Sequence, residues 1–145
     1  MNHKGTQTLV TPRLILRKFT LSDAQDMFDN WAGDERVTRY LSWPAHTDAE
    51  VSKRVIGQWL ESYKNDNTYN WVIEYEGRAV GNISVVRQEE PWDNCELGYC
   101  LGHAYWGKGL MTEACRAVID FLFKEVGYNR ISAYHAAENI GSGRV

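Results

Sequence analysis

A lysine between two glycines is the feature of this 145-residue chain whose residue types most directly suggest chemistry. Gly107-Lys108-Gly109 stands before a segment with helical spacing of apolar residues, where Ser, Thr, Asp or Asn would ordinarily cap the helix. Glycines without a capping side chain leave backbone N–H groups free to turn toward a ligand, and a helix N-terminus carries partial positive charge. The turn therefore indicates either a receptor for a diphosphate or a tight strand-to-helix connection, and its spacing fits both.

Two nucleotide-binding motifs overlap the same residues, and neither is complete. The run from Gly102 to Lys108 matches the first seven positions of a Walker A loop, but Gly109 stands where Ser or Thr should hold magnesium. A dinucleotide-binding fingerprint fails as well, because Thr112 occupies the position of its third glycine and the unit lies late in the chain. Both motifs therefore break at a residue on which they depend.

The cysteines and histidines have no spacing that suggests a metal or redox site. Cys95, Cys100 and Cys115 form no CxxC pattern, and their odd number argues against a closed set of disulfides. On one strand, a separation of five residues would place Cys95 and Cys100 on opposite faces. The four histidines lack HxxH or HxxxH spacing. We therefore expect no metal ion, and cysteines that serve as apolar core residues.

The elements that position the glycine turn follow from the periodicity of the apolar residues. Segments rich in β-branched and aromatic residues predict strands at residues 9–18, 68–76, 79–88, 94–101 and 130–135. Apolar stripes at helical spacing predict helices at residues 22–30, 47–63 and 107–126, and residues 139–142 resemble the start of another. Because Glu76-Gly77 supplies a turn and residues 89–93 a break, the three middle strands are expected to form an antiparallel meander.

Composition narrows the class of protein. No repeat, low-complexity tract or linker divides residues 1–145, and 43% hydrophobic residues suffice for the core of one domain. A net charge of -3 gives no overall basic field, so we expect no nucleic-acid partner. No apolar run is long enough to cross a bilayer and the first residues lack the apolar stretch of a signal peptide, so we expect no membrane partner and a cytoplasmic location.

Four ordered segments together resemble the Gcn5-related N-acetyltransferases (GNAT), and within them the RimJ/RimL-like group of ribosomal-protein N-terminal acetyltransferases. The segments are Thr11-Pro12-Arg13-Leu14-Ile15-Leu16-Arg17, Glu96-Leu97-Gly98-Tyr99, Tyr105-Trp106-Gly107-Lys108-Gly109-Leu110-Met111-Thr112-Glu113-Ala114, and Glu138-Asn139-x-x-Ser142. Trp106 and Met111 depart from the general pattern, which has Gln or Arg and Gly or Ala at these positions. The resemblance implies an α+β (α/β) fold, in which a mixed, mostly antiparallel sheet flanked by helices splays beside its fourth strand to admit acyl-CoA.

The resemblance also implies which residues bind acetyl-CoA, the expected co-substrate. Carried over by position, the pantetheine arm would contact the backbone of Cys100, Leu101 and Gly102. The pyrophosphate would lie on Gly107, Lys108, Gly109, Leu110, Met111 and Thr112. Asn139 matches the residue that hydrogen-bonds the pantetheine arm in the family, and Ser142 lies one helical turn beyond it, on the same face.

The implied reaction is N-acetylation of a primary amine, on a protein N-terminus, an amino acid or a small molecule. The amine would attack the thioester directly, so only positioning and proton transfer are required of the protein. Glu96 is the leading candidate for the general base because it lies on the strand beside the expected gap, with Glu74 as the alternative. For the acid, Ser142, Tyr99 and Tyr134 compete, and Ser142 resembles the position used in the ribosomal-protein group.

Two other functions and one departure remain open at this stage. A non-catalytic acyl-CoA-binding module is the main alternative, and a nucleotide-binding protein with a partial Walker loop is the second. Family members continue past the Asn-x-x-Ser helix into two further strands, whereas this sequence stops at Val145. The resemblance therefore predicts a C-terminally incomplete domain whose exposed strand edge favours self-association, as a homodimer or by strand exchange.

Overall fold

Six strands form one mixed sheet in the computed structural model of the chain, which describes residues 2–39, 43–89 and 92–133. The strands are β1 (Leu9–Val10), β2 (Leu14–Arg17), β3 (Asn70–Tyr75), β4 (Arg78–Glu89), β5 (Asn94–Leu101) and β6 (Arg130–Ala133). They lie across the sheet in chain order, and every neighbouring pair is antiparallel except β5 and β6, which are parallel. The predicted mixed, mostly antiparallel sheet and its central meander are confirmed.

Helical segments occupy the connections before β3 and on both sides of the glycine turn. They are η1 (Leu21–Asp23), α1 (Ala24–Met27), η2 (Phe28–Ala32), α2 (Glu35–Thr38), α3 (Ala49–Ser62), η3 (His103–Tyr105), α4 (Leu110–Phe121) and η4 (Leu122–Val126). The single helix expected at residues 22–30 is a succession of 3₁₀, α and π turns. The one-turn helix α2, which Asp34 caps by accepting a hydrogen bond from the Arg36 N–H, was not predicted.

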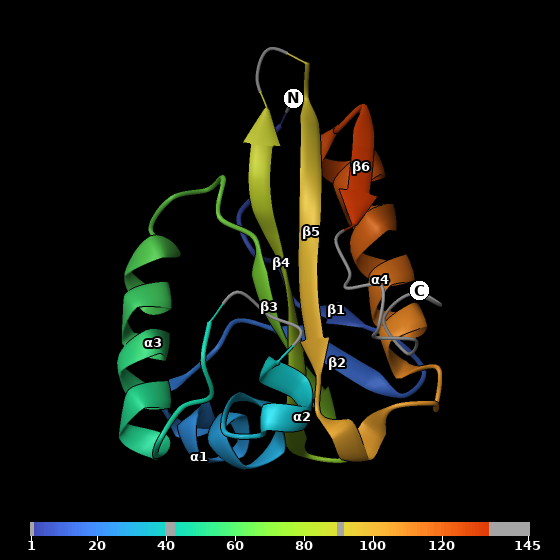
Figure 1. Cartoon of the computed structure of the whole chain (residues 1–145). Helices are drawn as coiled ribbons and strands as arrows, with labels where there is room; N and C mark the ends of the chain where they lie inside the picture. Colours follow the sequence, from blue (N-terminus) through green and yellow to red (C-terminus); the bar gives the residue numbers. More distant parts are fainter. Residues whose placement is uncertain (1, 40–42, 90–91, 134–145) are drawn as a thin grey trace.

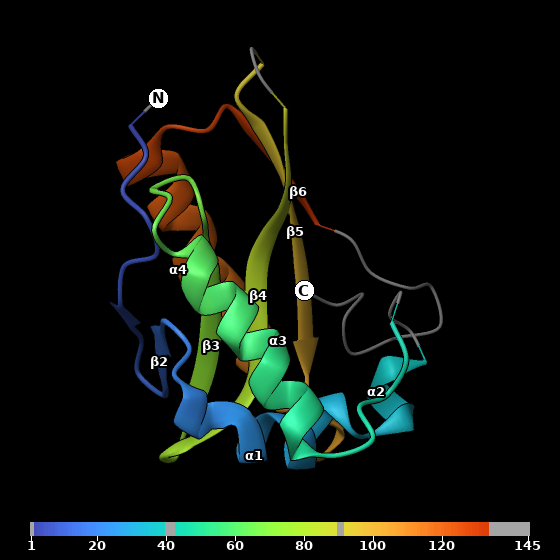
Figure 2. The same cartoon turned by 90° about the vertical axis from the view of Figure 1, so that its left-hand side faces the viewer.

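The helices cover both faces of the sheet (Figures 1 and 2). On one face α4 packs Leu110, Ala114 and Val118 into a core shared with the strands, and on the other face α1 and α3 cover a second core. Consecutive β3 residues are divided between the two cores, as the alternation of a strand requires: Trp71 belongs to the α4 side and Val72 to the α3 side. The central strands are therefore buried on both faces.

The first predicted strand is interrupted at Pro12. The Thr11 N–H donates to the Leu14 carbonyl, which closes a tight turn, and β1 and β2 pair antiparallel across it, Leu9 opposite Leu16. Proline has no N–H to offer to a sheet, so the chain turns where a continuous strand would lose a hydrogen bond. This turn places Arg13 beside the start of α4.

The strands β5 and β6 are paired over only half the length of β5. Asn94 to Leu97 lie opposite Arg130 to Ala133, and the remaining residues of β5, Gly98 to Leu101, are paired with β4 alone. Within the described residues, this part of β5 has no strand along its other edge. In the described part of the chain, β5 therefore has a strand neighbour on one side only from Gly98 to Leu101, and its other side, here called the free edge, runs toward the glycine turn.

Candidate active site

The turn that leads into α4 has a backbone conformation that favours glycine at two of its residues. Gly107 has a φ of 79° and Gly109 a φ of 75°, both in the left-handed region, and both residues are exposed. Gly109 is the N-cap of α4 and supplies no capping side chain. The helix itself begins at Leu110, three residues later than predicted, because the two glycines cannot be helical at positive φ. The glycine turn is thus an open, uncapped helix start.

The first amides of α4 point out of the helix toward this turn. The first backbone bond of the helix runs from the Glu113 N–H to the Gly109 carbonyl, so the amides of Leu110, Met111 and Thr112 have no acceptor within the helix. Unsatisfied N–H groups at the positive end of a twelve-residue helix attract anions. The geometry suits the binding of a phosphate group by main-chain atoms.

A cluster of hydrogen bonds around Glu113 fixes the position of the glycine turn. The Glu113 carboxylate accepts from the Thr11 hydroxyl, from the Arg13 backbone N–H (3.0 Å) and from Arg13 Nε (2.7 Å). Arg13 Nη1 in turn donates to the Lys108 carbonyl (2.9 Å) in the middle of the turn. Burial of Glu113 opposes its ionisation, but the hydrogen bonds from Thr11 and Arg13 prevail and hold its pKa below the ordinary value.

The free edge of β5 presents amides at every second residue. The Gly102 N–H donates to Val80 on β4 (2.8 Å), so strand alternation directs the backbone groups of Leu101 and Tyr99 toward the opposite edge. The indole of Trp106 donates to the Leu101 carbonyl (2.8 Å), which ties the end of the strand to the glycine turn. Of the residues predicted to contact a pantetheine arm, Leu101 therefore faces the edge, whereas Cys100 and Gly102 direct their backbone toward β4.

Gly102 contributes by its lack of a side chain. A Cβ at this position would lie 2.5 Å from the Asn30 carbonyl oxygen of η2, so only glycine lets the end of β5 approach that turn. The glycine therefore sets the path by which the chain leaves the sheet and enters the glycine turn.

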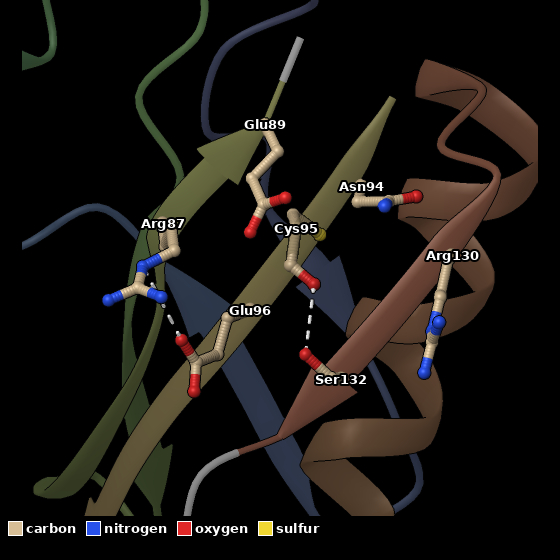
Figure 3. A pocket seen from close by; sticks show the side chains of 7 residues that line it. All are labelled: Arg87, Glu89, Asn94, Cys95, Glu96, Arg130 and Ser132. Carbon is tan, nitrogen blue, oxygen red and sulfur yellow. Dashed lines mark hydrogen bonds and ion pairs between the residues drawn. The ribbon is translucent and has the colours of Figure 1, made fainter. Parts of the chain in front are cut away.

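Glu96 lies on β5 where the pairing with β6 is about to end. Its register partner is Ser132, and the last pair of the two strands, Leu97 with Ala133, follows directly. The side chain is 29% exposed and its Oε2 lies 3.9 Å from Arg87 Nε. Figure 3 shows Glu96 and Arg87 turned toward each other on the same face of the sheet. Glu96 thus reaches solvent beside the start of the free edge.

The alternative base, Glu74, lies in a different environment. It is on β3, two strands away from β5, and accepts a hydrogen bond from Arg17 Nε (3.0 Å). Arg17 also donates two bonds to Asp23, at 2.9 Å each, so Glu74 belongs to an ion-pair network that ties β2 to the start of α1. The position of Glu74 favours a structural role, which leaves Glu96 as the carboxylate nearest the free edge among these two.

Of the three candidates for the general acid, Tyr99 is the one that lies within the described residues. Tyr99 is half-buried and packs against the core on the α4 side of the sheet, whereas Glu96 faces the other side. The other two candidates, Tyr134 and Ser142, lie outside the described residues, as does Asn139.

The cysteines are core residues on both sides of the sheet, as predicted. Cys95 belongs to the core under α4 and Cys100 packs against the core under α1, on the opposite face. Burial raises the pKa of Cys95 to about 11 and the pKa values of Cys100 and Cys115 to about 12. The thiols are therefore protonated at neutral pH, a state in which they are poor nucleophiles.

Within the described ranges, no three metal-ligating side chains gather in one place. Among the helices in the same ranges, none has the length and hydrophobicity required to cross a membrane.

A mixed, mostly antiparallel sheet with helices on both faces, and a glycine turn before α4, is the architecture of an acyl-CoA N-acyltransferase. Residues 13–145 match the family model described as "Acetyltransferase (GNAT) domain", so the chain belongs to that family. This family uses acetyl-CoA, and the chain is an acetyl-CoA-dependent N-acetyltransferase.

Relatives with known sequences support this assignment. The chain is 31% identical over 139 residues to the uncharacterized N-acetyltransferase p20 of Bacillus licheniformis, which covers 94% of this chain and 77% of the relative. It is 29% identical over 145 residues to the [ribosomal protein uS5]-alanine N-acetyltransferase of Escherichia coli (strain K12), with 93% and 73% covered.

Solved structures share the fold. A GNAT-family acetyltransferase from Bacillus anthracis superimposes with a TM-score of 0.79 at 26% identity, over 95% of this chain and 79% of that one. The microcin C7 self-immunity acetyltransferase MccE, solved with acetyl-CoA and AMP, superimposes with a TM-score of 0.78 at 20% identity, over 92% and 76%.

Two groups of residues near the site were not anticipated from the sequence. Arg13 and Glu113 were noted only as parts of motifs, and 100 positions separate them, so no local spacing could reveal their contact. Arg87 and Arg130 were not singled out at all, although both lie beside Glu96 in the folded sheet. The alternation of the strand could not place Arg87 beside Glu96, because a bulge in β4 changes the register between the two strands.

Proposed function

We propose that this chain acetylates a primary amine by direct attack of the amine on acetyl-CoA within a ternary complex. The observation that carries the proposal is the continuity of three features: Glu96 at one end, the free edge of β5 with the Leu101 amide in the middle, and the uncapped start of α4 at the other end. An extended ligand with a reactive group at one end and a diphosphate at the other matches this order.

Acetyl-CoA fits the site in one orientation. Its pantetheine arm would lie along β5, where the Leu101 N–H faces the edge, in the manner of a peptide added to a sheet. The pyrophosphate oxygens would accept hydrogen bonds from the backbone amides of residues 107–112, close to the positive charge of Lys108. The thioester would then lie close to the divergence of β5 and β6, near Glu96.

The chemistry requires one base and one proton for the leaving group. Glu96 takes a proton from the acceptor ammonium, directly or through water, and the free amine attacks the thioester carbonyl. The C–N bond forms, the C–S bond breaks, the nitrogen loses its second proton to water, and the departing thiolate is protonated to give CoA, so that one proton is released overall. For that last proton Ser142 remains our proposed donor. No covalent enzyme intermediate is needed, which accords with three thiols that burial keeps protonated.

Two-substrate kinetics with a panel of primary amines test this proposal. Release of CoA should follow intersecting double-reciprocal lines, since both substrates bind before any product leaves. Glu96→Gln should lower kcat about 10²-fold or more, the usual effect of losing a general base, with little change in the KM for acetyl-CoA. The matched control Glu74→Gln should keep kcat within a small factor, because Glu74 binds Arg17.

Two results would overturn the proposal. Tight binding of acetyl-CoA with no product on any amine would support the non-catalytic module. Parallel double-reciprocal lines with a trapped acetyl-enzyme would indicate a covalent intermediate.

A further inference from the structure

A polar pocket beside Glu96 bears on the class of acceptor. It has a volume of about 300 Å³, at the lower end of the range of small-molecule sites, and lies over β4, β5 and β6. Its lining consists of Arg87, Glu89, Asn94, Cys95, Glu96, Arg130 and Ser132, all drawn in Figure 3. Since Glu96 forms part of the wall, the pocket opens onto the proposed base.

A bulge in β4 shapes one wall of this pocket. Val85 pairs with Leu97 and Arg87 pairs with Glu96, so Val86 is an extra residue that has no partner on β5. Without the bulge, Val86 would lie opposite Glu96. The bulge therefore gives the proposed base an arginine neighbour on its own face of the sheet, at an Nε–Oε2 distance of 3.9 Å.

The same bulge depends on Gly98. A Cβ at Gly98 would lie 2.8 Å from Val86 Cγ1, so the glycine makes room for the extra residue. Val86 itself is 59% exposed, a high value for a valine in a central strand. The bulge that places Arg87 beside Glu96 thus exposes Val86 and requires a glycine at position 98. Bulges commonly change the direction of side chains next to active sites.

The opposite wall carries a second guanidinium. Arg130 lies opposite Asn94 in the parallel pairing of β5 and β6, and Asn94 is two residues before Glu96 on the same face of β5. Arg87 is engaged with Glu96, whereas no ion pair within the described ranges involves Arg130. The pocket thus holds two carboxylates, Glu96 beside Arg87 and Glu89 opposite Asn94 in the register of β4 and β5. Asn94, with Arg130 opposite it on β6, lies about 6.6 Å along the strand from Glu96.

We propose that the acceptor is an amine that also carries a carboxylate, joined to the amine by a short carbon chain. This inference rests on the proposed function. The ammonium would bind Glu96 and the carboxylate would bind Arg130 and Asn94, because a guanidinium recognises a carboxylate through two parallel hydrogen bonds. A free amino acid and an acidic residue at the N-terminus of a polypeptide both supply this chemistry.

Pairs of acceptors that differ only in a carboxylate and a carboxamide test the inference. The pairs are alanine and alaninamide, β-alanine and β-alaninamide, and glutamate and glutamine, together with peptides that begin with Asp or Asn. We expect kcat/KM to be about tenfold higher for the acid of at least one pair, the effect of one charged contact. The amides are weaker bases and have more free amine at a given pH, so basicity alone would favour them.

Variants at Arg130 separate recognition from a structural effect. Arg130→Gln should abolish the preference because it lowers kcat/KM for the acids about tenfold more than for the amides, through the KM of the acid, and Arg130→Lys should restore part of the preference. The matched control Arg116→Gln changes an exposed arginine on α4 and should leave the preference intact. Glu89→Gln, which removes a negative charge from the pocket, should improve the acid acceptors slightly.

The outcomes distinguish this inference from the function on which it rests. Equal turnover of acids and amides, or a preference for acids that survives in Arg130→Gln, overturns the acid-bearing acceptor and leaves N-acetylation standing. Absence of product from every member of the panel, with acetyl-CoA bound, overturns the proposed function itself. A preference confined to the free amino acids, or one confined to the peptides, supports the inference and identifies the source.

Discussion

The guanidinium of Arg13 bridges the carboxylate of Glu113 and the carbonyl of Lys108. Its Nε donates to Glu113 at 2.7 Å and its Nη1 to Lys108 at 2.9 Å. One side chain from the turn after β1 therefore contacts both the first turn of α4 and the glycine turn before it. The conformation of the proposed pyrophosphate site is consequently tied to a segment at the far end of the sequence.

Loss of this bridge should weaken acetyl-CoA binding more than it weakens the fold. We expect Arg13→Ala to raise the KM for acetyl-CoA about tenfold, with the KM of the acceptor unchanged, because only the glycine turn loses its support. The matched control is Arg78→Ala. Arg78 is similarly exposed and forms an ion pair with Asp26 of α1 at 3.0 Å, with no contact to Lys108 or Glu113.

Steady-state kinetics and thermal melting of both variants check this prediction. If Arg13→Ala and Arg78→Ala shift the KM for acetyl-CoA equally, the bridge has no special connection with the ligand. If melting temperature falls strongly in Arg13→Ala while the KM stays constant, the bridge serves only the fold.

Positive φ at the glycine turn should make it intolerant of side chains. Gly107→Ala and Gly109→Ala should each lower the free energy of unfolding by about 1–2 kcal/mol, the cost of a left-handed conformation for an L-residue. Gly57→Ala is the matched control, since Gly57 lies within α3 and a Cβ there meets nothing within 4 Å. That variant should be more stable by about 0.5–1 kcal/mol.

The same three variants also test the ligand. Acetyl-CoA should raise the melting temperature of Gly57→Ala as much as that of the original chain, and should raise it less in the two turn variants. Equal ligand-induced shifts in all of them would contradict the placement of the pyrophosphate.

Stability should decrease in acid partly because of Glu113. Its pKa is lowered in the folded chain, so its contribution is fully present above the unfolded pKa of about 4.3 and is lost as the pH falls through the folded pKa. Denaturant titrations at several pH values should show Glu113→Gln to be less stable than the original chain at pH 7. The two should converge toward pH 3. A constant difference across this range would show that the Glu113 charge does not matter.

Alkylation should leave the folded protein intact. Because burial raises the pKa of Cys100 and Cys115 to about 12, iodoacetamide at pH 7.5 should modify neither thiol in the native state and both in denaturant. Intact mass and residual activity, measured on the same samples, give the result. Rapid labelling of one native thiol with loss of activity, and protection by acetyl-CoA, would point instead to a reactive cysteine.

Self-association remains a prediction about the chain in solution. Gel filtration with light scattering measures the mass of the particle. A monomer that is active at all concentrations would contradict the prediction of self-association. A dimer that dissociates on dilution together with loss of activity would support it.

Local sequence patterns predicted the central meander well. The turn between β3 and β4 was expected at Glu76-Gly77, and both residues have positive φ, 52° and 80°, as a two-residue hairpin of type I′ requires. Asp48, expected at the start of a helix, accepts a hydrogen bond from the Val51 N–H as the cap of α3. These features depend on residues within a few positions of one another.

Features that depend on distant residues were not predictable in the same way. The extra residue Val86 in β4 arises from the register with β5, so Arg87 gave no sign that it would face Glu96. The anchor of the glycine turn comes from Arg13, near the beginning of the chain. The position of the glycine turn was nevertheless predictable, because the positive φ of the backbone there requires the two glycines that the sequence shows.

The alternation of β5 makes amide hydrogen exchange a measure of acetyl-CoA binding. The Gly102 N–H donates into the sheet and strand alternation directs the Cys100 amide the same way, while the Leu101 amide faces the free edge. Under the proposed placement, deuterium would enter the Leu101 amide more slowly once acetyl-CoA is present, while the amides of Cys100 and Gly102 exchange slowly throughout. Leu101 and its two neighbours would then report whether the enzyme holds its co-substrate.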